Sequence, residues 1–155
     1  MAGTMANTNI GRFDEISADI LAFLYERFPI PEYISPAVAG LSVIVYGDYD
    51  PVSGLHKNMS GEIDPETELF NSTLAWLVHA GFIHEKGSQH FSSRYFLTAQ
   101  GLQALKHVPK PALGAETLGE KLSVATKAGA KSAASELLNQ ALSIGVQLIT
   151  KQAGF

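Results

Sequence analysis

Apolar side chains recur every three or four residues between Phe13 and Phe28, with acidic side chains on the other side of the pattern. This spacing is typical of an amphipathic helix whose apolar stripe faces a core. Pro29 and Pro31 follow, and proline ends a helix because it lacks the backbone N–H donor. The pattern therefore predicts a first helix over residues 13–28.

The pattern in residues 32–63 leaves alternatives open. The apolar, β-branched run LSVIVY at residues 41–46 fits a buried strand, whereas Ser35 and Pro36 fit the start of a short helix. Residues 47–61 are rich in turn-forming types, which predicts an exposed loop. The two candidate positions for a short second helix are residues 36–43 and residues 52–59.

The clearest pattern lies between Asp64 and Gly81. Asp64 can accept hydrogen bonds from the free N–H groups at a helix start, and Pro65 is favoured at the first helical position. Gly81 supplies the left-handed residue at which helices commonly stop. Between these signals the sequence predicts a helix whose buried side carries Leu69, Phe70, Thr73, Leu74, Trp76 and Leu77.

Two short strands are predicted after this helix, at residues 82–85 and 94–97, around a polar hairpin tip at residues 86–93. Thr98 follows the second strand and can cap a further helix over residues 99–107. The order is therefore helix, strand, strand, helix, with short connections.

Beyond residue 108 the composition changes. Residues 109–116 contain two prolines and are interpreted as a linker. Residues 117–150 are rich in Ala, Leu, Lys and Gln, which favour helix, and their apolar positions keep roughly helical spacing. We interpret this stretch as one long amphipathic helix, or as two helices that meet near Gly129.

Two segments of this part of the chain resemble winged helix-turn-helix domains, including the bacterial MarR-like and PadR-like regulators. They are LAWLVHAGFI at residues 74–83 and YFLTAQGLQAL at residues 95–105. The first is similar to a recognition helix that turns into the first wing strand. The second is similar to the second wing strand, which enters a helix through a Leu-Thr-x-x-Gly step. The resemblance covers about residues 13–107. It implies a mainly α protein with a small β-hairpin, an α+β winged helix, followed by a C-terminal helical extension.

This interpretation divides the chain into four parts. A length of 155 residues suits one compact domain and an extension. The expected parts are a flexible tail at residues 1–12, a winged-helix domain at 13–108, a linker at 109–116 and a C-terminal amphipathic helix at 117–150.

The resemblance implies that the recognition helix and the wing bind double-stranded DNA. The outward face of the helix carries Glu68 and several small or polar side chains that could approach base edges, although an ordinary solvated face would have the same composition. The wing supplies two cations for phosphate contacts. The candidate DNA-binding residues are Asn71, Ser72, Ala75, His79, Lys86 and Arg94.

The distribution of charge opposes this function. The formal net charge is −4, and acidic residues outnumber basic ones up to Val108. DNA affinity depends largely on the neutralisation of phosphates by Lys and Arg. The charge therefore favours the alternative function, a non-catalytic protein–protein interaction module built on a winged helix. The resemblance favours a DNA-binding transcriptional regulator of bacterial or phage type.

The C-terminal amphipathic helix has an apolar side that an isolated helix cannot bury. It either packs back on the domain or forms a homodimer, and small residues at four-residue spacing would let two helices approach closely. Because winged-helix regulators commonly dimerise through terminal helices, the resemblance favours a homodimer. The candidate oligomerisation residues are Leu122, Gly129, Leu137, Ala141, Ile144 and Leu148.

The sequence contains none of the common motifs for catalysis or metal binding, so we expect no enzyme activity, no metal and no cofactor. The absence of cysteine excludes disulfides and suits a reducing cytoplasm. The first residues do not resemble a signal peptide, and no run of about 18 apolar residues could span a membrane. These observations predict a cytoplasmic protein with no membrane partner.

Overall fold

The computed structural model is mainly helical, with a small antiparallel sheet, and this confirms the predicted α+β class. The residues that it describes are 8–41, 49–52, 55–56, 65–87, 93–109 and 114–152. Along the chain, the elements are α2 (Asn9–Arg27), β1 (Glu32–Tyr33), the 3-10 helix η1 (Pro36–Ala39), β2 (Tyr49–Asp50), β3 (Leu55–His56), α3 (Pro65–His79), β4 (Ile83–Lys86), β5 (Arg94–Leu97), α4 (Ala99–Lys106), α5 (Leu118–Lys127) and α6 (Lys131–Gln152).

Helix α2 begins four residues before its predicted start. The Thr8 hydroxyl accepts a hydrogen bond from the Gly11 backbone N–H at 2.9 Å, which satisfies one of the free donors at the helix start. The prediction of a flexible tail over residues 1–12 is therefore wrong for residues 9–12, and residues 1–7 lie outside the described part. The apolar pattern missed this start because Ile10, in the first turn, is exposed.

The three-stranded sheet has the order β1–β5–β4, with both pairs antiparallel. Ile83 pairs with Leu97 and both side chains are buried, so their face of the sheet covers the core. Because side chains alternate along a strand, His84 and Lys86 lie on the outer face. Strand β1 has only two residues, too few for an alternating pattern, and it was not predicted.

Residues 32–63, for which the sequence left alternatives open, contain short elements in their described part. Helix η1 lies within the first candidate range for a second helix, residues 36–43. Strands β2 and β3 pair with each other inside the predicted loop at residues 47–61. The predicted strand at residues 41–46 lies outside the described residues, apart from Leu41.

Helix α3 has the predicted limits, and Gly81 follows it with a φ of 85°. Phe70, Thr73, Leu74 and Leu77 are buried as expected. Trp76 corrects the prediction, because 44% of it is exposed. Its indole packs edge-on against the ring of Phe13, with the centroids 5.0 Å apart, so it lines the edge of the α2–α3 contact and not the core.

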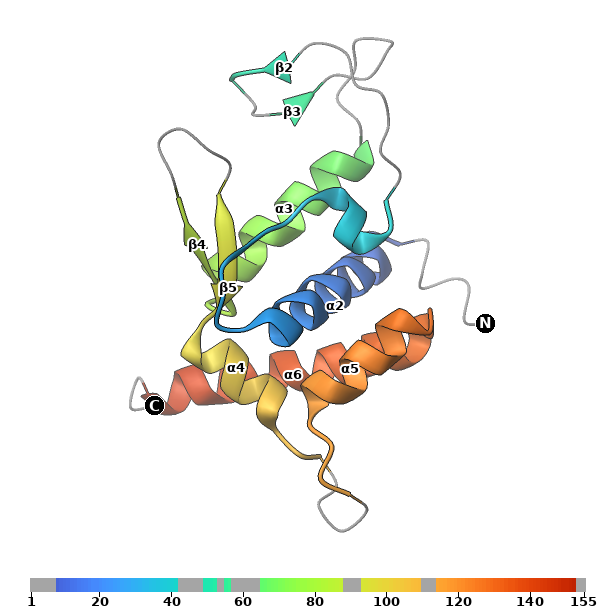
Figure 1. Cartoon of the computed structure of the whole chain (residues 1–155), viewed down its shortest axis with the longest axis vertical. Coiled ribbons are helices and arrows are strands. Elements are labelled where there is room, and N and C mark those ends of the chain that lie inside the picture. The colour runs from blue at the N-terminus through green and yellow to red at the C-terminus, as the bar shows by residue number, and fades with distance from the viewer. Residues whose placement is uncertain are drawn as a thin grey trace.

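The C-terminal segment forms two helices that pack on the rest of the domain. The Thr117 hydroxyl accepts from the Glu120 N–H at 3.1 Å to cap α5, and the chain turns at Gly129, whose φ is 69°. This confirms the alternative of two helices. Helix α2 lies between α3 and α5 in Figure 1, and α6 packs on α2, α4 and α5. Residues 117–150 therefore complete the core and are not a separate extension.

The start of α5 is also fixed to the end of α4. The Leu118 N–H donates to the His107 carbonyl at 2.8 Å, so the predicted linker, of which residues 110–113 lie outside the described part, joins two adjacent points. The Tyr25 hydroxyl lies 2.9 Å from the Thr117 hydroxyl and connects the same place to α2.

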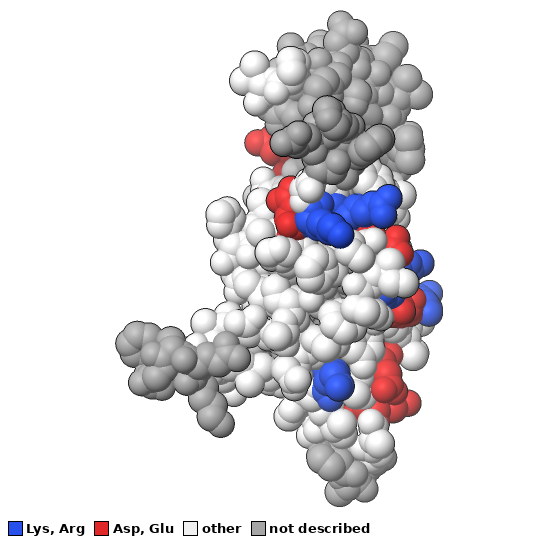
Figure 2. Space-filling view, turned by 60° about the vertical axis from the view of Figure 1, so that its left-hand side comes forward, with Lys and Arg blue, Asp and Glu red and all other residues white. Residues whose placement is uncertain are grey.

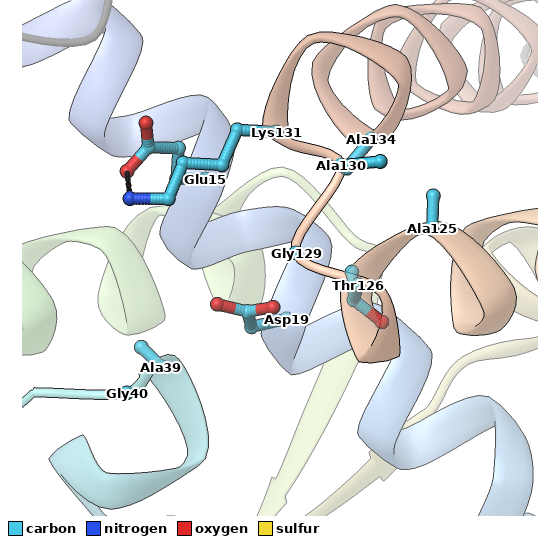
Figure 3. A pocket seen from close by; sticks show the side chains of 10 residues that line it. All are labelled: Glu15, Asp19, Ala39, Gly40, Ala125, Thr126, Gly129, Ala130, Lys131 and Ala134. Carbon is cyan, nitrogen blue, oxygen red and sulfur yellow. Dashed lines mark ion pairs between the residues drawn. The ribbon is translucent and has the colours of Figure 1, made fainter.

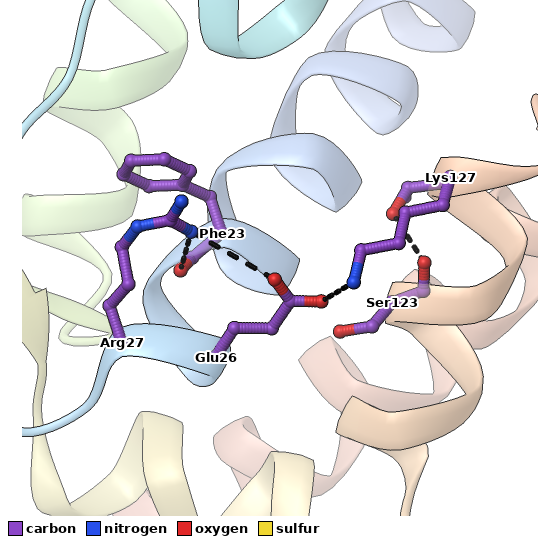
Figure 4. Close-up of polar contacts among 6 residues, drawn as sticks. Phe23, Glu26, Arg27, Ser123 and Lys127 are labelled. Carbon is purple, nitrogen blue, oxygen red and sulfur yellow. Dashed lines mark hydrogen bonds and ion pairs between the residues drawn. The ribbon is translucent and has the colours of Figure 1, made fainter.

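A surface cluster joins the ends of α2 and α5 (Figure 4). Lys127 Nζ lies 2.6 Å from Glu26 Oε1, and this contact lowers the pKa of Glu26. The Arg27 guanidinium lies over the Phe23 ring at 3.8 Å and donates to the Phe23 carbonyl at 3.3 Å. Of these contacts the Glu26–Lys127 pair joins α2 to α5, although exposed ion pairs add little stability.

Candidate nucleic-acid interface

The outward face of α3 consists of the side chains expected there. All five of its predicted members are exposed: Glu68, Asn71, Ser72, Ala75 and His79. Two acidic residues, Glu66 and Glu68, lie in the first turn, and α3 contains no Lys or Arg. Glu66 lies 3.4 Å from the Arg12 guanidinium of α2. The start of α3 is thus acidic, whereas its second half contains no Asp or Glu.

The two predicted wing cations lie opposite each other. Lys86 of β4 and Arg94 of β5 are cross-strand partners, and both are exposed. Because alternate residues share a face, His84 and Phe96 lie on the same side, with their ring centroids 5.2 Å apart. Tyr33 of β1 pairs with Arg94 and is also exposed. We call this set, Tyr33, His84, Lys86, Arg94 and Phe96, the outer sheet face.

Two members of the outer sheet face were not found from the sequence. Tyr33 is distant from the hairpin in sequence and reaches it only through the pairing of β1 with β5. The alternation in RYFL could have placed Phe96 beside Arg94. His90, in the predicted hairpin tip at residues 86–93, lies outside the described residues.

The opposite side of the hairpin carries a negative charge. The Ser93 hydroxyl donates to Glu85 Oε1 at 2.5 Å. Tyr95, which pairs with Glu85, has a raised pKa because it is partly buried and near that carboxylate.

On the face shown in Figure 2, Lys and Arg lie beside Asp and Glu, and the described residues there form no continuous positive strip.

A separate pocket of about 280 Å³ lies between α2, η1 and the turn from α5 to α6 (Figure 3). Asp19 points into it from α2, and its walls are small residues such as Ala39 and Gly129. Glu15 lies 3.7 Å from Lys131 Nζ at one side. Burial and the nearby Glu15 raise the pKa of Asp19 from 3.8 to about 6, while Lys131 partly opposes this shift.

This raised pKa predicts that Asp19 destabilises the fold at neutral pH. Ionisation is easier in the unfolded chain, so the unfolded state loses its proton first and stability falls as the pH rises from about 4 to about 6. Asp19→Asn should therefore raise the free energy of unfolding by about 1 kcal/mol at pH 7, after allowance for partial exposure. Urea unfolding at pH 4 and pH 7 measures the difference, which should vanish at pH 4.

The matched control is Glu136→Gln, which removes an exposed carboxylate on α6. It should change stability little at either pH. A less stable Asp19→Asn protein at pH 7 would contradict the assigned cost of the buried charge.

The predicted oligomerisation residues fall into two groups. Leu122 and Ala141 are buried inside the protomer, which corrects their assignment to an intermolecular surface. Gly129 is exposed at the α5–α6 turn. The other three residues are partly exposed on α6: Leu137, Ile144 and Leu148.

Two further properties concern possible ligands and membranes. Within the described ranges, no group of three or more His, Cys, Asp or Glu side chains could hold a metal ion. None of the helices in the described part of the chain is long and apolar enough to cross a membrane.

Comparison with known proteins gives no assignment. The chain matches no protein-family model, no curated protein and no solved structure.

Proposed function

We propose that the chain is a winged-helix protein that binds double-stranded DNA and regulates transcription. The observation that carries the proposal is the pairing of Lys86 with Arg94 on the outer face of a hairpin. This hairpin directly follows α3, which has one exposed face. The order of elements supports it as well. A short helix, η1, precedes α3, although β2 and β3 lie between the two helices, and β1 forms a sheet with the two strands of the hairpin.

The distribution of charge suggests how DNA would dock. Glu66 and Glu68 would repel phosphates at the start of α3, so its second half, next to the wing, would enter the major groove. Ala75 would allow close approach, and Asn71 and His79 would read base edges. Lys86 and Arg94 would contact phosphates and hold the register.

The expected result of the double substitution Lys86→Ala/Arg94→Ala is weaker binding to every duplex sequence. Each lost phosphate contact should reduce the slope of log affinity against log salt by about 0.9, so the double variant should lose nearly 2. Fluorescence anisotropy of a labelled mixed-sequence duplex, titrated at several salt concentrations, measures both quantities. Asn71→Ala should instead change the preference between sequences.

A charge-matched control is Lys106→Ala/Lys121→Ala, on α4 and α5. It removes the same charge away from the hairpin and should leave most of the affinity. Equal losses in the two double variants would refute the docking arrangement. Absence of binding by the unmodified protein at low salt would refute DNA binding itself.

The second candidate function is that of a protein-interaction module. It is favoured by exposed apolar side chains on α2 and α3, since Ile10 is 69% and Trp76 is 44% exposed. DNA-binding surfaces are rich in cations, whereas exposed aromatic residues are enriched in protein interfaces. If the duplex titration shows no binding, this candidate takes precedence.

A further inference from the structure

A groove on the molecular surface runs between α2 and α3 and reaches α6. Its volume is about 500 Å³, within the range of small-molecule sites. Its lining includes residues of all three helices: Ile10, Phe13 and Asp14 of α2, Ser72 and Trp76 of α3, and Asn139 of α6. These residues come from three distant parts of the sequence.

One part of the groove is aromatic and apolar. Phe13 and Trp76 meet edge to face at 5.0 Å, and the indole also stacks near the Phe82 ring at 6.5 Å. The indole is still 44% exposed, and Ile10 beside the groove is 69% exposed. An apolar ligand body would gain free energy by covering these side chains. The indole face also attracts cations.

Asp14 is the charged side chain among the residues that line the groove. Asp14 is only 9% exposed, so its charge is poorly hydrated, and burial raises its pKa. Its one hydrogen-bond donor among the described residues is Asn139 Nδ2, 3.3 Å from Oδ2. Asn139 Nδ2 is shared, since it also donates to the Ser135 carbonyl at 2.8 Å. Asp14 is thus a buried carboxylate with a weak protein partner.

No cation of the described chain neutralises this carboxylate. Within the described residues Asp14 forms no ion pair, and the nearby Arg12 contacts Glu66. The adjoining hollow along the start of α3 is lined by Glu66 and Glu68 as well as Arg12. The groove and its surroundings therefore carry a negative charge, and a buried carboxylate without a cation is costly.

We propose that this groove binds a small protonated amine with an apolar body. The ammonium group would donate a hydrogen bond to Asp14, and the body would cover Trp76 and Ile10. A charge-assisted hydrogen bond of this kind is stronger than a neutral one, so the carboxylate selects cations over neutral molecules of the same shape. The proposal is independent of DNA binding.

Trp76 is the only tryptophan of the chain and lines the groove, so its emission reports occupancy directly. The probe is 2-phenylethylamine at pH 7.5, titrated into the full chain. The comparison ligands are 2-phenylethanol, a neutral molecule of similar shape, and 3-phenylpropanoate, an anion. We expect saturable quenching or a spectral shift with the amine, about tenfold weaker binding of the alcohol, and no binding of the anion.

Asp14→Asn tests the role of the carboxylate. The variant should bind the amine no more tightly than the alcohol, while its affinity for the alcohol stays close to that of the unmodified protein. Binding of the alcohol also shows that the groove of the variant is intact. Asp19→Asn makes the same chemical change in the separate pocket and should leave the amine preference unaltered.

Three results would overturn the proposal. They are equal affinities of the unmodified protein for amine and alcohol, no saturable response to the amine, and an amine preference that survives Asp14→Asn. Because none of these measurements contains DNA, they are distinguishable from a failure of the proposed DNA binding.

Discussion

Replacing Gly101 with alanine is expected to destabilise the protein by about 2–3 kcal/mol, although alanine usually favours a helix. Gly101 lies in the first turn of α4, and a Cβ atom there would overlap the backbone carbonyl oxygen of Phe82. Higher helix propensity would contribute only about 1 kcal/mol in favour of alanine. The clash involves backbone that joins α3 to β4, so no side-chain rotation can relieve it.

Thermal unfolding measures this effect. For a chain of this size the midpoint should fall by roughly 5–10 °C. Gly87→Ala is the control, because a Cβ atom at Gly87 meets nothing within 4 Å. It should leave the midpoint nearly unchanged. A Gly101→Ala protein as stable as the Gly87→Ala protein would show that α4 does not lie this close to Phe82.

Leu122→Ala should have a similarly large effect, and the effect should be on folding and not on self-association. Leu122 has 0% exposure and packs inside the protomer, between α5 and the rest of the core. Removal of a buried leucine side chain costs about 2–5 kcal/mol, because it loses apolar burial and leaves a cavity. Urea unfolding measures the loss, and sedimentation velocity on the folded protein measures the oligomeric state.

The control for this variant is Val124→Ala in the same helix, whose side chain is exposed. It should lower the free energy of unfolding by less than about 1 kcal/mol. A Leu122→Ala protein that keeps its stability but changes its oligomeric state would instead place Leu122 at an intermolecular surface.

The sequence predicted the segment from α3 to α4 well, because its limits are set by local signals. Pro65 starts the first of these helices, Gly81 ends it, and Thr98 caps the next. The Thr98 hydroxyl accepts from the Gly101 N–H at 3.0 Å and also donates to the Gly81 carbonyl at 2.5 Å. The start, stop and cap signals act within a few positions of themselves, so their effect is visible in a linear pattern, whereas the Thr98–Gly81 contact spans 17 positions.

The error at Trp76 and the alternatives left open at the C-terminus concern tertiary contacts that no local pattern encodes. The exposure of Trp76 depends on how far α2 covers α3, and its position within the apolar stripe of α3 looked like that of a core residue. The back-packing of α5 and α6 depends on whether α2 and α4 offer an apolar surface to them. The same apolar stripe would suit a dimer equally well.

The candidate sites divide in the same way. The outward face of α3 followed from helical geometry, and Lys86 and Arg94 followed from the hairpin. The α2–α3 groove could not be predicted, because Asp14 and Asn139 are separated by 125 positions along the chain. Their meeting depends on the return of α6 to the start of α2.

Phe82 also has a consequence for how this sequence can change. Its ring occupies the place that a side chain on Gly145 would need, while its backbone excludes a side chain at Gly101. The connection between α3 and β4 is therefore packed against α6, where the Phe82 ring lies in the space left by the absent side chain of Gly145. A larger residue at position 145 is compatible with the fold only if the residue at position 82 becomes smaller, so these two sites form an epistatic pair that constrains the evolution of both α6 and the start of the hairpin.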